Sequence, residues 1–132
     1  MSQTPEPSSG GHSTAPAIDT GLLFSRCRGN VSFGLALLGE LEATGEQLVD
    51  EIARHIVAGD CTAAAVAAHG LKGAAAIIAA DPLRSCAAKL ESVGTSSDVE
   101  CLMSLIEDLR QEMKRCLAAI PKIRGRARQA MS

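Results

Sequence analysis

One histidine, one lysine and one glycine fall at a spacing that could support chemistry in this 132-residue chain. They lie in residues 68–73, AHGLKG, within an alanine-rich segment that should be helical because alanine is the strongest helix former. Helical residues three and four apart are neighbours, so His69, Lys72 and Gly73 share one patch. It combines a nucleophilic imidazole, a fixed positive charge and a position without a side chain. Such a patch suits a histidine that accepts a phosphoryl group from a bulky partner protein.

The predicted surface around His69 is small and sparse. At about 100° per residue, the other residues within about 60° of His69 are Thr62, Ala65, Val66, Ala76 and Ala80. We expect His69 to point outward and this partly apolar surface to be where a partner docks. The opposite side should pack inward; it carries Ala64, Ala67, Leu71, Ala74, Ala75 and Ile78.

Two glycines in the same helix are unexpected, because each is about 1 kcal/mol less favourable than alanine in a helix interior. Gly70 projects from the side of the helix, where we expect it to let a neighbouring helix approach. Gly73 lies one turn after His69 on the exposed side, and its predicted role is clearance beside the imidazole. Gly73 is therefore the more informative glycine.

The other two histidines have plainer interpretations. His12 lies in a stretch rich in Ser, Thr, Pro and Gly and is interpreted as a solvated residue. His55 follows Arg54 near the end of a predicted helix, where a cation complements the helix dipole. Because a histidine and lysine at this spacing often occur by chance, the interpretation of His69 depends on the small residues and the fold around it.

The composition indicates one all-α domain with tails. Hydrophobic residues make up 46% of the chain, yet there are two Phe and no Trp or Tyr, and alanine is the most frequent residue. The net charge of −2 gives no strong attraction to nucleic acid or membrane. The five cysteines include no CxxC pair, which argues against a disulfide scaffold or a zinc site. Because no secretory signal is visible either, we predict a cytoplasmic protein.

The predicted architecture is an up-and-down antiparallel four-helix bundle with a short additional N-terminal helix, over residues 18–120. Residues 1–17 should form a disordered tail, and residues 121–132 a solvated basic tail after Pro121 closes the last helix. The predicted helices span 18–28, 31–58, 61–80, 81 to about 94, and 99–120. Their predicted N-caps are Asn30, Asp60, Asp81 and Ser97, the last in a capping box with Glu100.

The chain resembles the histidine-containing phosphotransfer (HPt) domains of bacterial phosphorelays over residues 18–120. Residues 68–75, AHGLKGAA, agree with the family's AH-x-LKG-x-A core. Leu90-Glu91 agrees with its trailing hydrophobic-LE segment. One departure is Ala79-Ala80, where the family often has Gly-Ala. Since alanine is the better helix former, we expect it to firm up this helix end.

The resemblance implies that His69 is phosphorylated, that Lys72 assists the phosphoryl group and that Gly73 keeps the surface open. The protein would be a phosphorelay intermediate without autokinase activity. It would exchange the group with aspartates in receiver domains of response regulators or hybrid histidine kinases. The family's receiver partners bring Mg²⁺, so no cofactor or metal site is expected on this chain. We further expect a monomer that binds neither nucleic acid nor membrane.

Two other functions fit parts of the sequence. A helical interaction module could bind a receiver domain or another protein through the same patch without phosphotransfer. A metal-binding bundle is less well supported, because it needs clustered ligands on facing helices and no carboxylate or second histidine lies one turn from His69.

Overall fold

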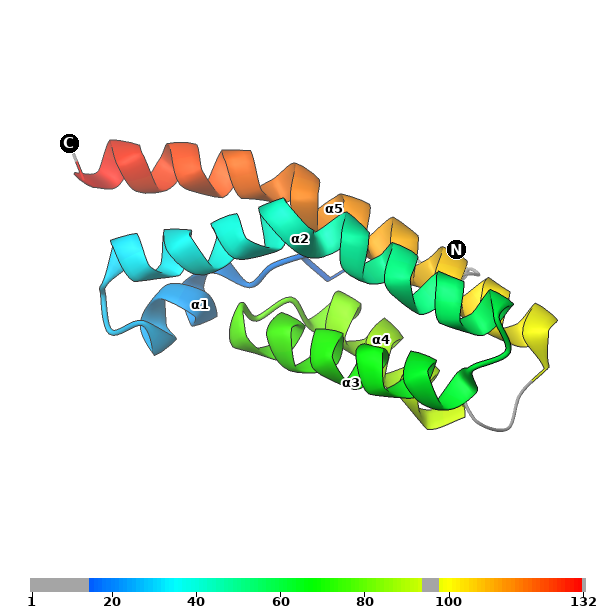
Figure 1. The fold of residues 1–132 in the computed structure, drawn as a ribbon. Helices are drawn as coiled ribbons and strands as arrows, with labels where there is room; N and C mark the ends of the chain where they lie inside the picture. Colours follow the sequence, from blue (N-terminus) through cyan, green and yellow to red (C-terminus); the bar gives the residue numbers. More distant parts are fainter. Residues whose placement is uncertain (1–14, 94–97, 132) are drawn as a thin grey trace, which may run out of the picture.

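The computed structural model describes residues 15–93 and 98–131. These residues contain five helices and no strand, so the all-α prediction is confirmed (Figure 1). The helices are α1 (Thr20–Arg26), α2 (Val31–Val57), α3 (Cys61–Ile77), α4 (Asp81–Val93) and α5 (Val99–Met131).

The four long helices form an up-and-down bundle in two layers, with α2 beside α5 and α3 beside α4 (Figure 1). Helix α3 packs against α2 and α4, and α5 packs against the same two helices, which places α3 and α5 at opposite corners. Short α1 contacts α2 at one end of the bundle. The face of α3 that points away from the bundle centre is therefore open to a partner.

The core fixes the rotation of α3 about its axis. Ala64, Ala68, Leu71 and Ala75 are its buried residues, and their spacing of three and four marks one inward stripe. Ala67 and Ala74, which we predicted to face inward, are only half-buried, while Ala68 is fully buried. The inward stripe is thus rotated slightly from the predicted one, but it leaves His69 on the outside.

Most of the predicted helix starts are confirmed. The side chains of Asn30 and Asp60 accept hydrogen bonds from the amides of Phe33 and Ala63, as N-caps do. Asp98, which accepts from the Cys101 amide at 2.8 Å, caps α5, whereas the predicted cap Ser97 lies outside the described residues.

Asp81 was wrongly predicted to be the N-cap of α4. The helix begins at this residue, and the Asp81 carboxylate accepts a hydrogen bond from Arg84 Nε at 2.9 Å. The residue that precedes the helix is Ala80, whose carbonyl accepts the Arg84 amide.

Helix α3 ends earlier than predicted, at Ile77 instead of Ala80. Ala79 has φ +60°, and the amides of Ala79 and Ala80 bond back to the carbonyls of Ala76 and Ala75. This pattern is a Schellman motif, in which glycine is favoured at the left-handed position. The interpretation that alanine firms up this helix end was therefore wrong, because Ala79 lies in a conformation about 1–2 kcal/mol unfavourable for L-residues.

The prediction that Pro121 closes the last helix was also wrong. Helix α5 runs through Pro121 to Met131. Ile123 is buried, and the Arg124 guanidinium forms an ion pair with Glu42 of α2. The burial of Ile123 and the ion pair of Arg124 keep α5 in the bundle past Pro121, although proline removes one backbone hydrogen bond. Arg124 is thus part of the bundle and not of a solvated tail.

The segment before α1 belongs to the bundle from Ala17 onward. Ala17 and Ile18 are buried, and the Asp19 amide donates to the Ala79 carbonyl at 2.9 Å, whereas Leu22 is exposed. Of the predicted disordered tail, residues 1–14 lie outside the described residues. No helix in the part of the chain that the structure describes is long and apolar enough to cross a bilayer.

Candidate functional site

His69 projects from the outer face of α3, as predicted. Two thirds of its side chain is exposed (67%), while its neighbour Ala68 and Leu71 two residues later are fully packed inside. The imidazole is therefore available to a partner, but its backbone is anchored by the core.

Glu91 of α4 joins His69 and Lys72 into one cluster. Glu91 Oε2 lies 2.6 Å from His69 Nδ1, and Glu91 Oε1 lies 2.6 Å from Lys72 Nζ. The preceding residue, Leu90, is buried and fixes this turn of α4 against the core. One carboxylate thus bridges the two side chains that we singled out from the sequence.

The charge state of Glu91 decides which imidazole nitrogen is reactive. The hydrogen bond from Lys72, followed by that from His69, holds the pKa of Glu91 below its usual range. At neutral pH this carboxylate is therefore ionised and can only accept hydrogen bonds, so Nδ1 of His69 must donate. The neutral imidazole then carries its lone pair on Nε2, which makes no hydrogen bond with the described residues.

Both glycines near His69 face open space. Apart from its chain neighbours and the backbone of its own helical turns, a Cβ built at Gly73 would meet no atom of the described structure within 4 Å, as its predicted role requires. The same is true of Gly70, so the prediction that Gly70 lets a neighbouring helix approach was wrong. Neither glycine is explained by packing among the described residues.

The predicted docking residues are mostly at the surface. Thr62, Val66 and Ala76 are exposed, and Ala65 is half-buried. Ala80 is fully buried, so its assignment to the docking surface was wrong. The helical extrapolation failed there because α3 ends before Ala80 and the chain turns inward toward α4.

The residue that sequence reasoning missed is Glu91. It lies 22 positions after His69 on another helix, where helical spacing says nothing about contact. The agreement of Leu90-Glu91 with the HPt pattern was the one available signal. In the described part of the chain, no group of three or more His, Cys, Asp or Glu side chains is placed to hold a metal ion.

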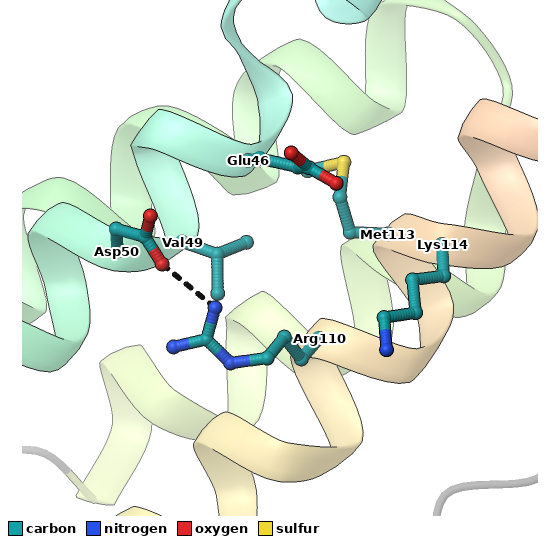
Figure 2. A pocket seen from close by; sticks show the side chains of 6 residues that line it. All are labelled: Glu46, Val49, Asp50, Arg110, Met113 and Lys114. Atoms are coloured by element: carbon teal, nitrogen blue, oxygen red, sulfur yellow. Dashed lines mark hydrogen bonds and ion pairs between the residues drawn. The ribbon is translucent and has the colours of Figure 1, made fainter.

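A polar hollow between α2 and α5 is lined by residues of these two helices (Figure 2). Arg110 reaches from α5 to α2, where its Nη1 bonds Asp50 Oδ1 at 2.7 Å (Figure 2). The hollow is also lined by Glu46, Val49, Met113 and Lys114. None of these lining residues is a histidine or a cysteine. The ion pair of Arg110 and Asp50 is interpreted as a crosslink between the two helices.

An all-α bundle with an exposed histidine on one outer helix face is suited to carry a chemical group on that histidine. The family model of the Hpt domain matches residues 36–120, a range that includes His69, Lys72, Gly73 and Glu91. No curated protein and no solved structure matches the chain. The family match covers more than half of the sequence, and the protein belongs to the Hpt domain family. Proteins of this family are histidine phosphotransfer intermediates of phosphorelays and not kinases.

Proposed function

We propose that His69 accepts a phosphoryl group from the aspartyl phosphate of one receiver domain and donates it to the aspartate of another. The observation that carries this proposal is the pairing of Nδ1 with an ionised carboxylate beside an open surface, which leaves Nε2 as an exposed nucleophile. Family membership supports phosphotransfer on a histidine in general.

His69 and Glu91 have different roles in this transfer. The Nε2 lone pair of His69 attacks phosphorus, the bond from phosphorus to the aspartate oxygen breaks, and the aspartate leaves as a carboxylate. The product ring carries Nδ1–H and a phosphorylated Nε2, so it gains a positive charge. Glu91 stabilises this charge through its bond to Nδ1, and preorganised opposite charge of this kind lowers a barrier because it needs no reorganisation.

Lys72 serves the phosphoryl group itself. Its ammonium is a compact positive charge one turn from His69, held by Glu91 at 2.6 Å. When the phosphoryl oxygens arrive beside the imidazole, Lys72 can turn from the carboxylate toward them. Gly73 leaves the room that this approach needs.

The partner completes the site. A receiver domain is expected to contribute the aspartate and the Mg²⁺ ion, so this chain works without a cofactor of its own and has no autokinase activity. The proposed setting is a cytoplasmic monomer that meets receiver domains of response regulators or hybrid histidine kinases.

The test is transfer from a purified, labelled receiver to this chain, followed by mapping of the product. We expect acid-labile, base-stable phosphate on His69, linked through Nε2, which ³¹P NMR distinguishes from the Nδ1 isomer. Linkage through Nδ1 would contradict the role of Glu91. Stable binding of the receiver without any phosphate on this chain would instead indicate a non-phosphorylated interaction module.

A further inference from the structure

Charge is distributed unevenly along α5, the longest of the five helices. Its residues 99–112 carry four acidic side chains and one arginine, whereas residues 113–131 carry six lysine or arginine side chains and no acidic one. A cation complements the helix dipole only in the last turn, so the dipole explains few of these six. The net charge of −2 therefore hides a separation of charge along the bundle.

Two of these cations are not used within the bundle. Ile123 is buried and Arg124 pairs with Glu42 of α2, which orients the last turns of α5. Lys122 and Arg126 are exposed and make no hydrogen bond or ion pair with the described residues. They lie one turn apart, where like charges repel, so their spacing does not stabilise the helix.

A third exposed cation lies in the turn between α1 and α2, which is at the same end of the bundle as the last turns of α5 (Figure 1). Arg28 in this turn has φ +56°, a left-handed conformation that favours glycine. Arg28 is also exposed. Because glycine would suit the backbone better at this position, the packing of the bundle does not explain an arginine there.

Exposed apolar side chains lie at this end as well. Phe33, in the first turn of α2, is 54% exposed, and Leu22 of α1 is 41% exposed. Arg26, the last residue of α1, lines two shallow hollows, one together with Phe33 and the other together with Leu22. The two apolar side chains therefore lie on either side of one guanidinium.

We infer that this end of the bundle binds the surface of an anionic lipid bilayer through Phe33 and Leu22, with Arg28, Lys122 and Arg126 beside the lipid phosphates. A protein that binds such a surface needs both kinds of side chain. Apolar side chains enter the headgroup region, and cations are attracted to the anionic lipids. The bundle would stand on the bilayer on the end that holds α1.

The apolar side chains favour a bilayer over nucleic acid. A duplex offers phosphates to the cations but leaves Phe33 and Leu22 in water. Proteins that bind single strands stack successive bases on several aromatic side chains. This chain has two Phe and no Trp or Tyr, and its other phenylalanine, Phe24, packs against the core.

A bilayer at this end of the bundle leaves His69 open. His69 lies eight residues, or about 12 Å of helix axis, before Ile77, the last residue of α3. Its exposed imidazole faces outward from the side of the bundle, whereas the bilayer would meet the end. Bilayer binding does not depend on phosphotransfer and is measured without a receiver.

The test is sedimentation of the full chain with large vesicles of phosphatidylcholine, either alone or with about one third phosphatidylserine, at low salt. The wild type should bind the anionic vesicles and not the neutral ones, and its binding should weaken as salt is added. The double variant Lys122→Gln, Arg126→Gln should bind about 25-fold more weakly, because each cation near an anionic surface contributes about fivefold.

A matched double variant removes the same charge from the opposite end. Arg54, near the end of α2, and Lys89, near the end of α4, are both exposed. Arg54→Gln with Lys89→Gln should bind the anionic vesicles like the wild type. An equal loss in both double variants would overturn the lipid-binding end, because binding would then follow net charge alone.

The apolar contacts are tested in the same way. Phe33→Ser should bind about tenfold more weakly, since its ring would no longer leave water. The control is Val57→Ser at the opposite end, where the valine is 74% exposed, and it should bind like the wild type. Leu22→Ser gives a second apolar test if Phe33→Ser lowers the melting temperature.

Three further results would overturn the proposal. No binding of the wild type to anionic vesicles at low salt would exclude a bilayer as the occupant. Unchanged vesicle binding by both Phe33→Ser and Leu22→Ser, together with tighter binding to a random-sequence DNA duplex, would assign the cations to nucleic acid. A salt-sensitive dimer that Lys122→Gln with Arg126→Gln dissociates would assign them to a second copy of this chain. A wild type that binds anionic vesicles but accepts no phosphate from any receiver would contradict the proposed function and leave the lipid-binding end intact.

Discussion

The α3–α4 face and the α2–α5 face of the bundle are both crosslinked by charged side chains, yet they are built differently. Across α2 and α5, Arg110 pairs with Asp50, and Gly45 lets Met113 pack so closely that a Cβ would lie 2.7 Å from its sulfur. Across α3 and α4, Glu91 accepts from both His69 and Lys72, and the nearby glycines face open space.

The difference shows what distinguishes a site from a structural crosslink. In the ion pair of Arg110 and Asp50, both charged groups are used for the contact between the two helices. In the cluster around Glu91, one nitrogen of an imidazole is used for positioning and the other is left exposed. The glycines follow the same division, because Gly45 makes room for the protein's own side chain and Gly73 makes room beside the imidazole.

Removing one partner of the crosslink on each face should give the sharpest contrast. We expect His69→Gln to abolish phosphate acceptance while its stability changes by about 0.5 kcal/mol or less, as is usual for an exposed residue. Asp50→Asn should transfer normally. Acceptance assays and thermal melts of both variants check this, and collapse of the His69 variant would show that this side chain supports the core.

Removing the cation from each face tests whether Lys72 acts on the phosphoryl group. Lys72→Ala should slow transfer by an amount equivalent to a few kcal/mol without eliminating it. The matched variant Arg110→Ala should leave transfer unchanged, because its partner Asp50 lies on the other face. Single-turnover rates with a phosphorylated receiver give the answer, and wild-type kinetics in Lys72→Ala would reduce this residue to a structural partner of Glu91.

The same substitution at the two kinds of glycine should have opposite effects. Gly45→Gln forces a side chain against Met113 and should destabilise the bundle by about 1–3 kcal/mol. Gly73→Gln should keep or slightly raise stability, by up to about 1 kcal/mol, because glutamine is the better helix former. Its transfer rate should fall. Denaturant melts and transfer assays of both variants check this. A Gly73→Gln variant that is destabilised but still transfers at full speed would contradict the distinction.

The smallest expected effect is the pH dependence that Glu91 adds to stability. Its pKa is lowered in the folded protein, so its contribution is complete above the ordinary glutamate pKa of about 4.3 and is lost as the pH falls through the lowered value. Melts of the wild type and Glu91→Gln from pH 7 to pH 3 should therefore converge at the acid end. Curves that stay parallel would mean that the carboxylate is not held by Lys72 and His69.

Local signals along the chain were enough to predict that five helices form and that His69 faces outward. Helix formation depends on local propensity and caps, and the periodicity of Leu71 and its neighbours orients the helix whatever it packs against. For the same reason the N-caps Asn30 and Asp60 were predictable, since each acts within three residues.

Which distant groups meet could be learned only from the packing of the helices. The contact of Glu91 with His69 joins two helices, and the burial of Ala80 follows from a turn set by Ala79 in a left-handed conformation. The passage of α5 through Pro121 depends on the burial of Ile123 and on the ion pair of Arg124 with Glu42 of α2, which outweigh a local signal to stop. The Glu91 contact and the extension of α5 both depend on residues far apart in sequence, and spacing along one helix carries no information about such contacts.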